Sequence, residues 1–340
     1  MVSLGSSDYF RMILDCPGVN RTPLSVARPK RDGSQSGHIR QGDIQLPKVR
    51  VSGIVPILQL PFDEFGGVLY EDLESEIDFA IKSGVHGIAL GVASELNKLT
   101  DVERDQVISA VVRHVNGRKP IVIGTSSQST SVTISRSRRA VELGANMAMI
   151  SPDGFGGFPA EDVRRHYLSV ADSVDIPIML QDRTGASITP ALMAQLADDH
   201  EAFSHAKVET LPTPPRFADT KRLAGDSLVL LGGVNGAFLI EEMNRGSEGA
   251  MASIAIVDVL CEVWEQYGSG DTSGAAERWE RHTHLVEMYR YGQGMNYWMA
   301  KEILRLRGVF TSAYPRLPAR KPDETAFREV REMCERLELI

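Results

Sequence analysis

The sequence has few cysteines, no excess of positive charge and no long apolar run. The three cysteines, Cys16, Cys261 and Cys334, are odd in number and far apart, which predicts a reducing compartment and neither a disulfide framework nor a zinc site. No apolar run approaches the roughly 20 residues that span a bilayer. A formal net charge of -8, without a basic cluster interleaved with aromatics, argues against a nucleic-acid partner. We therefore expect no membrane and no nucleic-acid partner.

The first 46 residues lack the periodicity of the rest of the chain. Gly, Ser, Pro and Arg are scattered through SVARPKRDGSQSGHIRQGD, which is typical of an extended or disordered arm. The segment has no apolar core of a secretory signal. Its arginines and serines leave a mitochondrial transit peptide as an alternative, which Asp8, Asp15 and Asp32 disfavour. We interpret residues 1–46 as an arm that packs on a neighbouring subunit, and we expect a cytoplasmic protein.

From Val51 onward, short β-branched runs alternate with amphipathic stretches, which is the pattern of βα units in a parallel sheet. The predicted strands are 51–60, 87–90, 120–124, 146–151, 176–181, 203–208, 227–231 and 249–253. The predicted helices between them are 70–83, 101–115, 131–143, 161–173, 189–197, 215–223, 237–245 and 257–267. Eight strands, each followed by a helix, predict an α/β protein with a closed (β/α)8 TIM barrel over residues 47–270. An open dinucleotide-binding sheet would need GxGxxG after the first strand, where LPFDEFGG stands instead.

After Gly270 no further strand is predicted. Three helical stretches remain, at residues 273–291, 295–307 and 323–339. They are too short and too charged to form a separate catalytic domain. We therefore interpret residues 271–340 as a C-terminal helical region that caps the barrel or contributes to an oligomer interface.

One lysine, Lys207, lies inside a short apolar run of the segment FSHAKVETLPTP. Burial of an ammonium group disfavours its charged form, and a neutral lysine amine attacks carbonyl carbons. In a (β/α)8 barrel the reacting groups lie at the carboxyl ends of the strands. Because side chains alternate along a strand, His205, Lys207 and Glu209 share one face. The alternative is that Lys207 extends its amine into solvent, as most lysines do.

Five segments together resemble the dihydrodipicolinate synthase and N-acetylneuraminate lyase family, from about Val51 to the C-terminus. They are GVASELNKLTDVER, RTGASITP, AKVE, LLGGVNGAFLIEEMNRGSEGAMAS and YWMAKEILRLRG. The resemblance implies a homotetramer or homodimer that needs no metal or organic cofactor. It also implies that Lys207 forms a Schiff base with a 2-oxo acid such as pyruvate.

The sequence departs from this family at positions that matter for chemistry. Where the family holds a substrate carboxylate with two threonines, this chain has Val92, Ala93 and Ser94. Gln181 stands at the position of the strand-five tyrosine, and the second family tyrosine falls beside Gly154. We therefore expect a divergent member with a different substrate, and not dihydrodipicolinate synthase itself. Further substrate contacts are expected from the ends of strands seven and eight, at Asn235, Met251 and Ser253.

Replacement groups stand near Lys207. Glu209 is the candidate proton shuttle, or else the partner of an arginine at the barrel rim. Arg183 matches the family arginine that meets a substrate carboxyl, or else pairs with Asp182. Gln181 can donate and accept hydrogen bonds.

For two other polar residues the structural role is the favoured one. Asp153 is a general acid or, as the favoured interpretation, the cap of the following helix. His205 is expected to be a hydrogen-bonded core histidine, with a role as a base as the weaker alternative.

These observations predict a Schiff-base lyase, an aldolase or a dehydratase, that acts on a 2-oxo acid. Two alternatives remain open. The first is a catalytically silent paralogue that binds a small carboxylic acid or a protein partner, which the missing threonines and tyrosines suggest. The second is a barrel enzyme in which Lys207 acts through its charge, without forming an imine.

Overall fold

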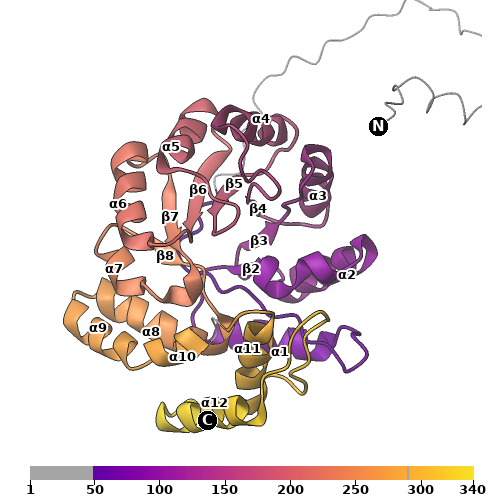
Figure 1. Ribbon diagram of the computed structural model, residues 1–340, viewed down its shortest axis with the longest axis vertical. Coiled ribbons are helices and arrows are strands. Elements are labelled where there is room, and N and C mark those ends of the chain that lie inside the picture. Colours follow the sequence, from indigo (N-terminus) through magenta and orange to yellow (C-terminus); the bar gives the residue numbers. More distant parts are fainter. Residues whose placement is uncertain (1–48, 289–290) are drawn as a thin grey trace, which may run out of the picture. The chain divides into compact units, whose positions relative to one another are not determined.

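The computed structural model describes residues 49–288 and 291–340 (Figure 1). The predicted arm at residues 1–46 lies outside the described residues. Eight strands form one parallel sheet in the order β1-β8-β7-β6-β5-β4-β3-β2. The strands are β1 Gly53–Ile54, β2 Ile88–Leu90, β3 Ile121–Gly124, β4 Met147–Ile150, β5 Ile178–Asp182, β6 Phe203–Val208, β7 Val229–Gly232 and β8 Gly249–Ala250. The described helices are all too short or too polar to cross a lipid bilayer.

The sheet closes on itself next to its first strand. β1 pairs with β8, and Ile57, three residues beyond β1, forms parallel bridges to Ala89 in β2 and to Ser253. The first strand is shorter than predicted because Gly53 has a φ of 76° and Pro56 has no N–H to donate to the ladder. The predicted (β/α)8 barrel is thus confirmed.

Helices follow the strands in sequence and lie outside the sheet (Figure 1). They are α1 Tyr70–Lys82, α2 Asp101–Val115, α3 Thr130–Glu142, α4 Ala160–Ala171, α5 Pro190–Asp199, α6 Thr213–Ala224, α7 Leu239–Met243 and α8 Val257–Gly268. Local signals in the sequence explain their starts. Thr100 and Glu103 form a capping box at α2, and Thr189 accepts a hydrogen bond from Leu192 N–H ahead of Pro190 in α5.

Apolar side chains fill both the inside of the barrel and the space between the sheet and the helices. The inner cluster contains Val55, Ile57, Ala89, Val122, Met147, Met149, Met179, Val229, Leu231 and Met251. Two outer clusters pack the opposite faces of the strands against the helices. The barrel interior is therefore a packed core, and polar groups of a site must lie above it at the strand ends.

The C-terminal region contains four helices in its described part: α9 Thr272–Glu280, α10 Thr283–Met288, α11 Met295–Leu306 and α12 Glu324–Arg336. The prediction of one helix over residues 273–291 is wrong where the chain is described. A turn at residues 281–282 separates α9 from α10, and residues 289–290 of that range lie outside the described residues. Trp279, Val286, Ile303 and Val330 join the outer core cluster. This region therefore packs on the barrel through a shared core.

Candidate active site

Lys207 lies near the carboxyl end of β6, and its side chain faces the barrel interior. In the parallel register it is opposite Gln181 of β5 and Leu231 of β7. Its neighbours Ala206 and Val208 point the other way, into an outer apolar cluster. Only 4% of Lys207 is exposed. The alternative of a solvent-exposed amine is therefore wrong.

Glu209 is the carboxylate next to this amine. Lys207 Nζ lies 3.1 Å from Glu209 Oε1. Gln181 Nε2 donates a hydrogen bond to Glu209 Oε2 at 2.8 Å, and the backbone N–H of Val234 donates to Oε1 at 3.2 Å. The alternative of an arginine partner for Glu209 is wrong, since the cation is Lys207. Three chain segments thus fix the Glu209 carboxylate beside the Lys207 amine. This fixed position favours proton transfer between Glu209 and a group bound to the amine.

The turn after β7 makes room for this carboxylate. A Cβ atom added to Gly233 would lie 2.1 Å from Glu209 Cγ, and one added to Gly232 would lie 3.0 Å from Glu242 Cδ. Val234 and Asn235 follow with φ values of 50° and 56°. The GGVNG segment is thus a turn of close backbone approach, and only glycine fits at position 233.

Arg183 contacts a different carboxylate from the one that its alternative interpretation named. Its Nη2 donates to Asp153 Oδ1 at 2.6 Å and its Nε to Ser151 Oγ at 3.4 Å. Asp182 is buried and pairs instead with Arg216, at 2.5 Å to Nε. The alternative of an Arg183–Asp182 salt bridge is therefore wrong. Arg183 is thus anchored at the carboxyl ends of β4 and β5, and it lines the pocket.

Asp153 does not cap the helix that follows it. Helix α4 begins at Ala160 after Pro159, without a side-chain cap, and the Asp153 carboxylate accepts from Ser151 Oγ at 2.8 Å as well as from Arg183. The capping interpretation is wrong because α4 begins seven residues beyond Asp153, at Ala160. Asp153 positions Arg183.

The segment after β2 forms two 3-10 turns, η1 Val92–Ser94 and η2 Leu96–Lys98. Val92 and Ala93 line the pocket. Ser94 is buried, and its Oγ accepts from the N–H of Gly91 at 3.0 Å. The aliphatic side chains cannot hydrogen-bond a substrate, so this turn offers a carboxylate only backbone groups.

The remaining candidates lie outside the pocket lining. Asn235 is half-buried next to Val234, which lines the pocket. Met251 packs in the inner apolar cluster, and Ser253 Oγ accepts from Ala255 N–H at 3.3 Å at the start of η4 Ile254–Ile256. His205 is a buried core histidine, as expected: Val51 N–H donates to its Nε2 at 3.0 Å, and burial lowers its pKa to about 4.

Tyr297 and Asn296 at the start of α11, and Thr184 after β5, line the same pocket and were missed by sequence reasoning. Strand periodicity cannot find residues 296 and 297, because they come from a helix beyond the last strand. Lys98 Nζ lies 4.5 Å from the centre of the Tyr297 ring. Burial raises the pKa of Tyr297, Glu95 raises it further, and Arg183 opposes the rise. The pocket thus contains a protonated phenol supplied by the C-terminal region.

Together these groups form a pocket of about 320 Å³ at the barrel mouth, within the range of small-molecule sites. We call it the lysine pocket; its lining residues are Ile57, Gly91, Val92, Ala93, Met149, Gln181, Arg183, Thr184, Lys207, Glu209, Val234, Asn296 and Tyr297. A buried lysine beside a fixed carboxylate at the mouth of a (β/α)8 barrel is the arrangement of an enzyme that attacks carbonyl carbons.

Comparison with known proteins gives the family. The model of the dihydrodipicolinate synthetase family matches residues 50–337, and the chain belongs to this family. L-2-keto-3-deoxyarabonate dehydratase of Azospirillum brasilense is 30% identical over 286 residues, which cover 82% of this chain and 92% of that protein. 4-Hydroxy-tetrahydrodipicolinate synthase of Methanopyrus kandleri is 28% identical, with coverage of 84% and 95%.

Solved structures agree with this assignment. Dihydrodipicolinate synthase from Rhodopseudomonas palustris superimposes with a TM-score of 0.78 at 25% identity, covering 84% of this chain and 97% of that chain. A prophage protein of the dihydrodipicolinic acid synthase family from E. coli K12, solved in complex with pyruvate, gives 0.79 at 25% identity, with coverage of 85% and 99%. The expected class, a Schiff-base lyase for pyruvate-derived substrates, is confirmed, and a catalytically silent paralogue is not favoured.

Proposed function

We propose that the protein is a dehydratase that removes water from a 2-oxo acid carrying a hydroxyl at C4, through an imine on Lys207. The observation that carries the proposal is the 3.1 Å separation of Lys207 Nζ and Glu209 Oε1 at the mouth of the closed barrel. When C2 of the substrate is bound to Nζ as an imine, the substrate's C3 atom lies two bonds from that nitrogen. It is then within reach of the Glu209 carboxylate. A nucleophile and a base for the adjacent carbon are thus adjacent in space.

The steps follow from these positions. The Lys207 amine attacks C2, and the carbonyl oxygen leaves as water, which forms the imine. Glu209 then takes a proton from C3, and the electron pair forms the C2–C3 double bond of an enamine. The enamine expels the C4 hydroxyl, which leaves as water after taking a proton from an acid. Hydrolysis of the imine returns Lys207 and the product, with the net loss of one water.

Two acids can donate the proton to the leaving hydroxyl. One is Glu209, which is protonated after the previous step. The other is the phenol of Tyr297, whose raised pKa keeps it protonated at neutral pH. Tyr297, from helix α11, thereby takes the place of the tyrosine that the family supplies from strand five. At that strand position this chain has Gln181, which donates a hydrogen bond to Glu209.

We assign the binding of the substrate carboxylate to Arg183 and Thr184, which line the same pocket as the amine. Arg183 has guanidinium donors beyond the two that contact Asp153 and Ser151. Thr184 adds a hydroxyl next to it in the lining. A bidentate arginine contact suits a carboxylate because the two groups match in geometry. We also propose that the protein assembles as a homotetramer or homodimer.

A dehydratase and an aldolase differ in the bond that breaks. Incubation with L-2-keto-3-deoxyarabonate, the compound in the relative's name, should give a dehydrated C5 product and no pyruvate, as followed by mass spectrometry. The Tyr297→Phe variant should lower kcat with little change in KM, because its hydroxyl acts on the leaving group. Release of pyruvate by the wild-type protein would mean that C3–C4 is cleaved instead, and would refute the dehydratase proposal.

A further inference from the structure

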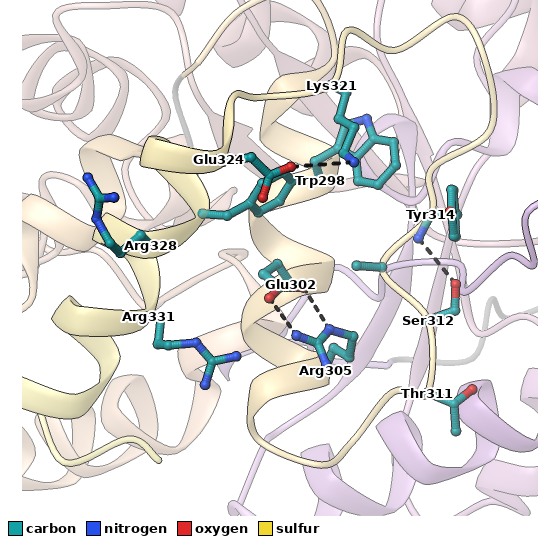
Figure 2. Close-up of a pocket in the computed structure, with 12 residues that line it drawn as sticks. Trp298, Glu302, Arg305, Thr311, Ser312, Tyr314, Lys321, Glu324, Arg328 and Arg331 are labelled. Atoms are coloured by element: carbon teal, nitrogen blue, oxygen red, sulfur yellow. Dashed lines mark hydrogen bonds and ion pairs between the residues drawn. The ribbon is translucent and has the colours of Figure 1, made fainter.

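A second cavity lies between α11, α12 and the segment that connects them (Figure 2). Its volume is about 540 Å³, which is the size of a small-molecule site. Its lining and that of the lysine pocket share no residue. We call it the α11–α12 cavity.

One wall of the α11–α12 cavity is aromatic. Trp298 packs against Tyr314, with ring centres 5.3 Å apart, and edge-on against Phe327 at 6.2 Å. Lys321 Nζ lies 5.8 Å from the Trp298 ring and 5.9 Å from the Phe327 ring. The ring planes meet at 59° and 76°, so the wall presents ring faces and edges with a cation beside them, against which an aromatic body with a negative group can pack.

The lining carries more positive than negative charge. Four cationic side chains face two carboxylates, Glu302 and Glu324, although the chain as a whole has a net charge of -8. Glu302 is taken by Arg305, with two hydrogen bonds of 2.8 and 2.7 Å. Glu324 lies 4.0 Å from Lys321. A charge excess of this kind attracts an anion.

Arg328 lies 3.8 Å from Glu332 on the same helix, so Arg331 is the cation left over. Within the described residues, no carboxylate lies within ion-pair distance of its guanidinium. Figure 2 shows its guanidinium extending from α12 toward that of Arg305 on α11, across the cavity. Two guanidinium groups that face one another leave a place for an anion between them, because an anion contacts both and screens their repulsion.

The indole N–H of Trp298 adds an independent sign of incomplete packing. Trp298 is 8% exposed, and its Nε1 is buried and finds no hydrogen-bond acceptor in the described part of the chain. A buried donor without an acceptor costs about 1–3 kcal/mol. An acceptor atom that reached this N–H would remove this cost.

We propose that the α11–α12 cavity binds a small organic anion with a planar apolar body, an aromatic carboxylate or sulfonate. The ring packs against Trp298 and Phe327, and the anionic group contacts Arg331 and Lys321. Helix α11 also carries Asn296 and Tyr297 of the lysine pocket. A ligand in the α11–α12 cavity therefore contacts the same helix as these two residues. The site is independent of the chemistry proposed for Lys207.

The test is titration calorimetry of the full chain with 2-naphthalenesulfonate as the probe. We expect saturable binding, with quenching of tryptophan fluorescence that is absent in Trp298→Phe. Methanesulfonate, which lacks the ring, and naphthalene-2-sulfonamide, which lacks the charge, should each bind at least about tenfold more weakly, a loss of about 1.4 kcal/mol.

Variants assign the binding to this cavity. Arg331→Ala and Lys321→Met should each weaken the probe about tenfold. Arg336→Ala, on the same helix and outside the lining, is the matched control and should keep the wild-type affinity. Arg183→Ala, which alters the lysine pocket, should keep it too. Absence of saturable binding, equal binding by the Arg331→Ala variant, or loss of binding in Arg183→Ala would overturn the proposal.

Discussion

Glu209 is, together with Lys207, the residue on which the proposed chemistry depends. It receives hydrogen bonds from Gln181 and from the N–H of Val234, and it contacts the amine. These contacts fix its orientation, so its carboxylate is available for the C3 proton without a conformational search.

Glu209→Gln keeps the size of the side chain and removes the base. Turnover should fall about 10²–10⁴-fold, while the protein still folds and still forms an imine with pyruvate. Steady-state kinetics and circular dichroism measure the two effects. Glu241→Gln, an exposed carboxylate on α7, is the control and should leave turnover unchanged. Full activity of the Glu209→Gln variant would exclude Glu209 as the base.

Glu242 gives the stability a specific dependence on pH. It is 1% exposed and accepts from Thr213 Oγ1 at 2.5 Å, and burial raises its pKa from 4.5 to about 8, against the lowering effect of Thr213. Between these two values the folded state holds a proton that the unfolded state has lost. The free energy of unfolding therefore falls as pH rises from 4.5 to 8, by at most about 1.4 kcal/mol per pH unit.

Glu242→Gln removes this titration and keeps an oxygen that accepts from Thr213. The variant should gain stability relative to the wild-type protein as pH rises from 5 to 8, as measured by urea unfolding at several pH values. Glu241→Gln on the same helix should follow the wild-type curve. Parallel curves for Glu242→Gln and the wild-type protein would show that Glu242 does not hold a proton in the folded state.

Residue-scale prediction from the sequence succeeded where strand alternation decides. It put His205, Lys207 and Glu209 on one face, and all three lie on the inner side of β6. It failed for Arg183 and Asp153, since the partner of a charged loop residue depends on how two separate loops fold. No local signal connects residue 183 to residue 153, so their contact could not be read from spacing.

At the scale of elements, helix α11 ties the C-terminal region to the barrel mouth. Lys301 is fully buried, and its ammonium contacts Glu95 in the loop after β2 and the carbonyl of Tyr314 at 3.3 Å. Glu95 also accepts from Lys98 at 2.7 Å and from Arg316 N–H at 3.1 Å. The same helix presents Tyr297 to the lysine pocket, so this buried network holds a catalytic element in place.

Lys301→Met should destabilise the protein by about 3 kcal/mol, because it leaves the buried carboxylate of Glu95 with less compensation. The double variant Lys301→Met and Glu95→Gln removes both charges and should recover a substantial part of that loss. Chemical unfolding of the three proteins measures the difference. If the double variant were no more stable than the single one, the buried ion pair would not be the source of the effect.

Some boundaries of strands and helices could be predicted from local signals in the sequence. Strand β6 and helix α2 have the predicted bounds, and the capping box of α2 was visible in the sequence. The first strand was predicted too long because apolar pattern alone does not register the φ of Gly53 or the missing N–H of Pro56. The turn between α9 and α10 carries no proline or glycine at residues 281–282, so no local signal marked it.

At the scale of the whole molecule, repeated βα units were sufficient to predict the barrel, and five short segments were sufficient to predict the family. The C-terminal region was predicted as a cap or an interface, but its contribution of Tyr297 and Asn296 to the lysine pocket was not. The candidate site residues were chosen because they follow the carboxyl ends of the predicted strands. A residue that reaches the site from a helix packed over the barrel can be found only once the packing is known.

The proposed function rests on an imine between Lys207 and a 2-oxo acid. The direct test is incubation of the full chain with pyruvate, reduction with borohydride and peptide mass spectrometry, with Lys207→Arg as the control. We expect one reduced pyruvate adduct, located on Lys207 and absent in the Lys207→Arg variant. A folded wild-type protein that gives no adduct, or an adduct on another lysine, would contradict it.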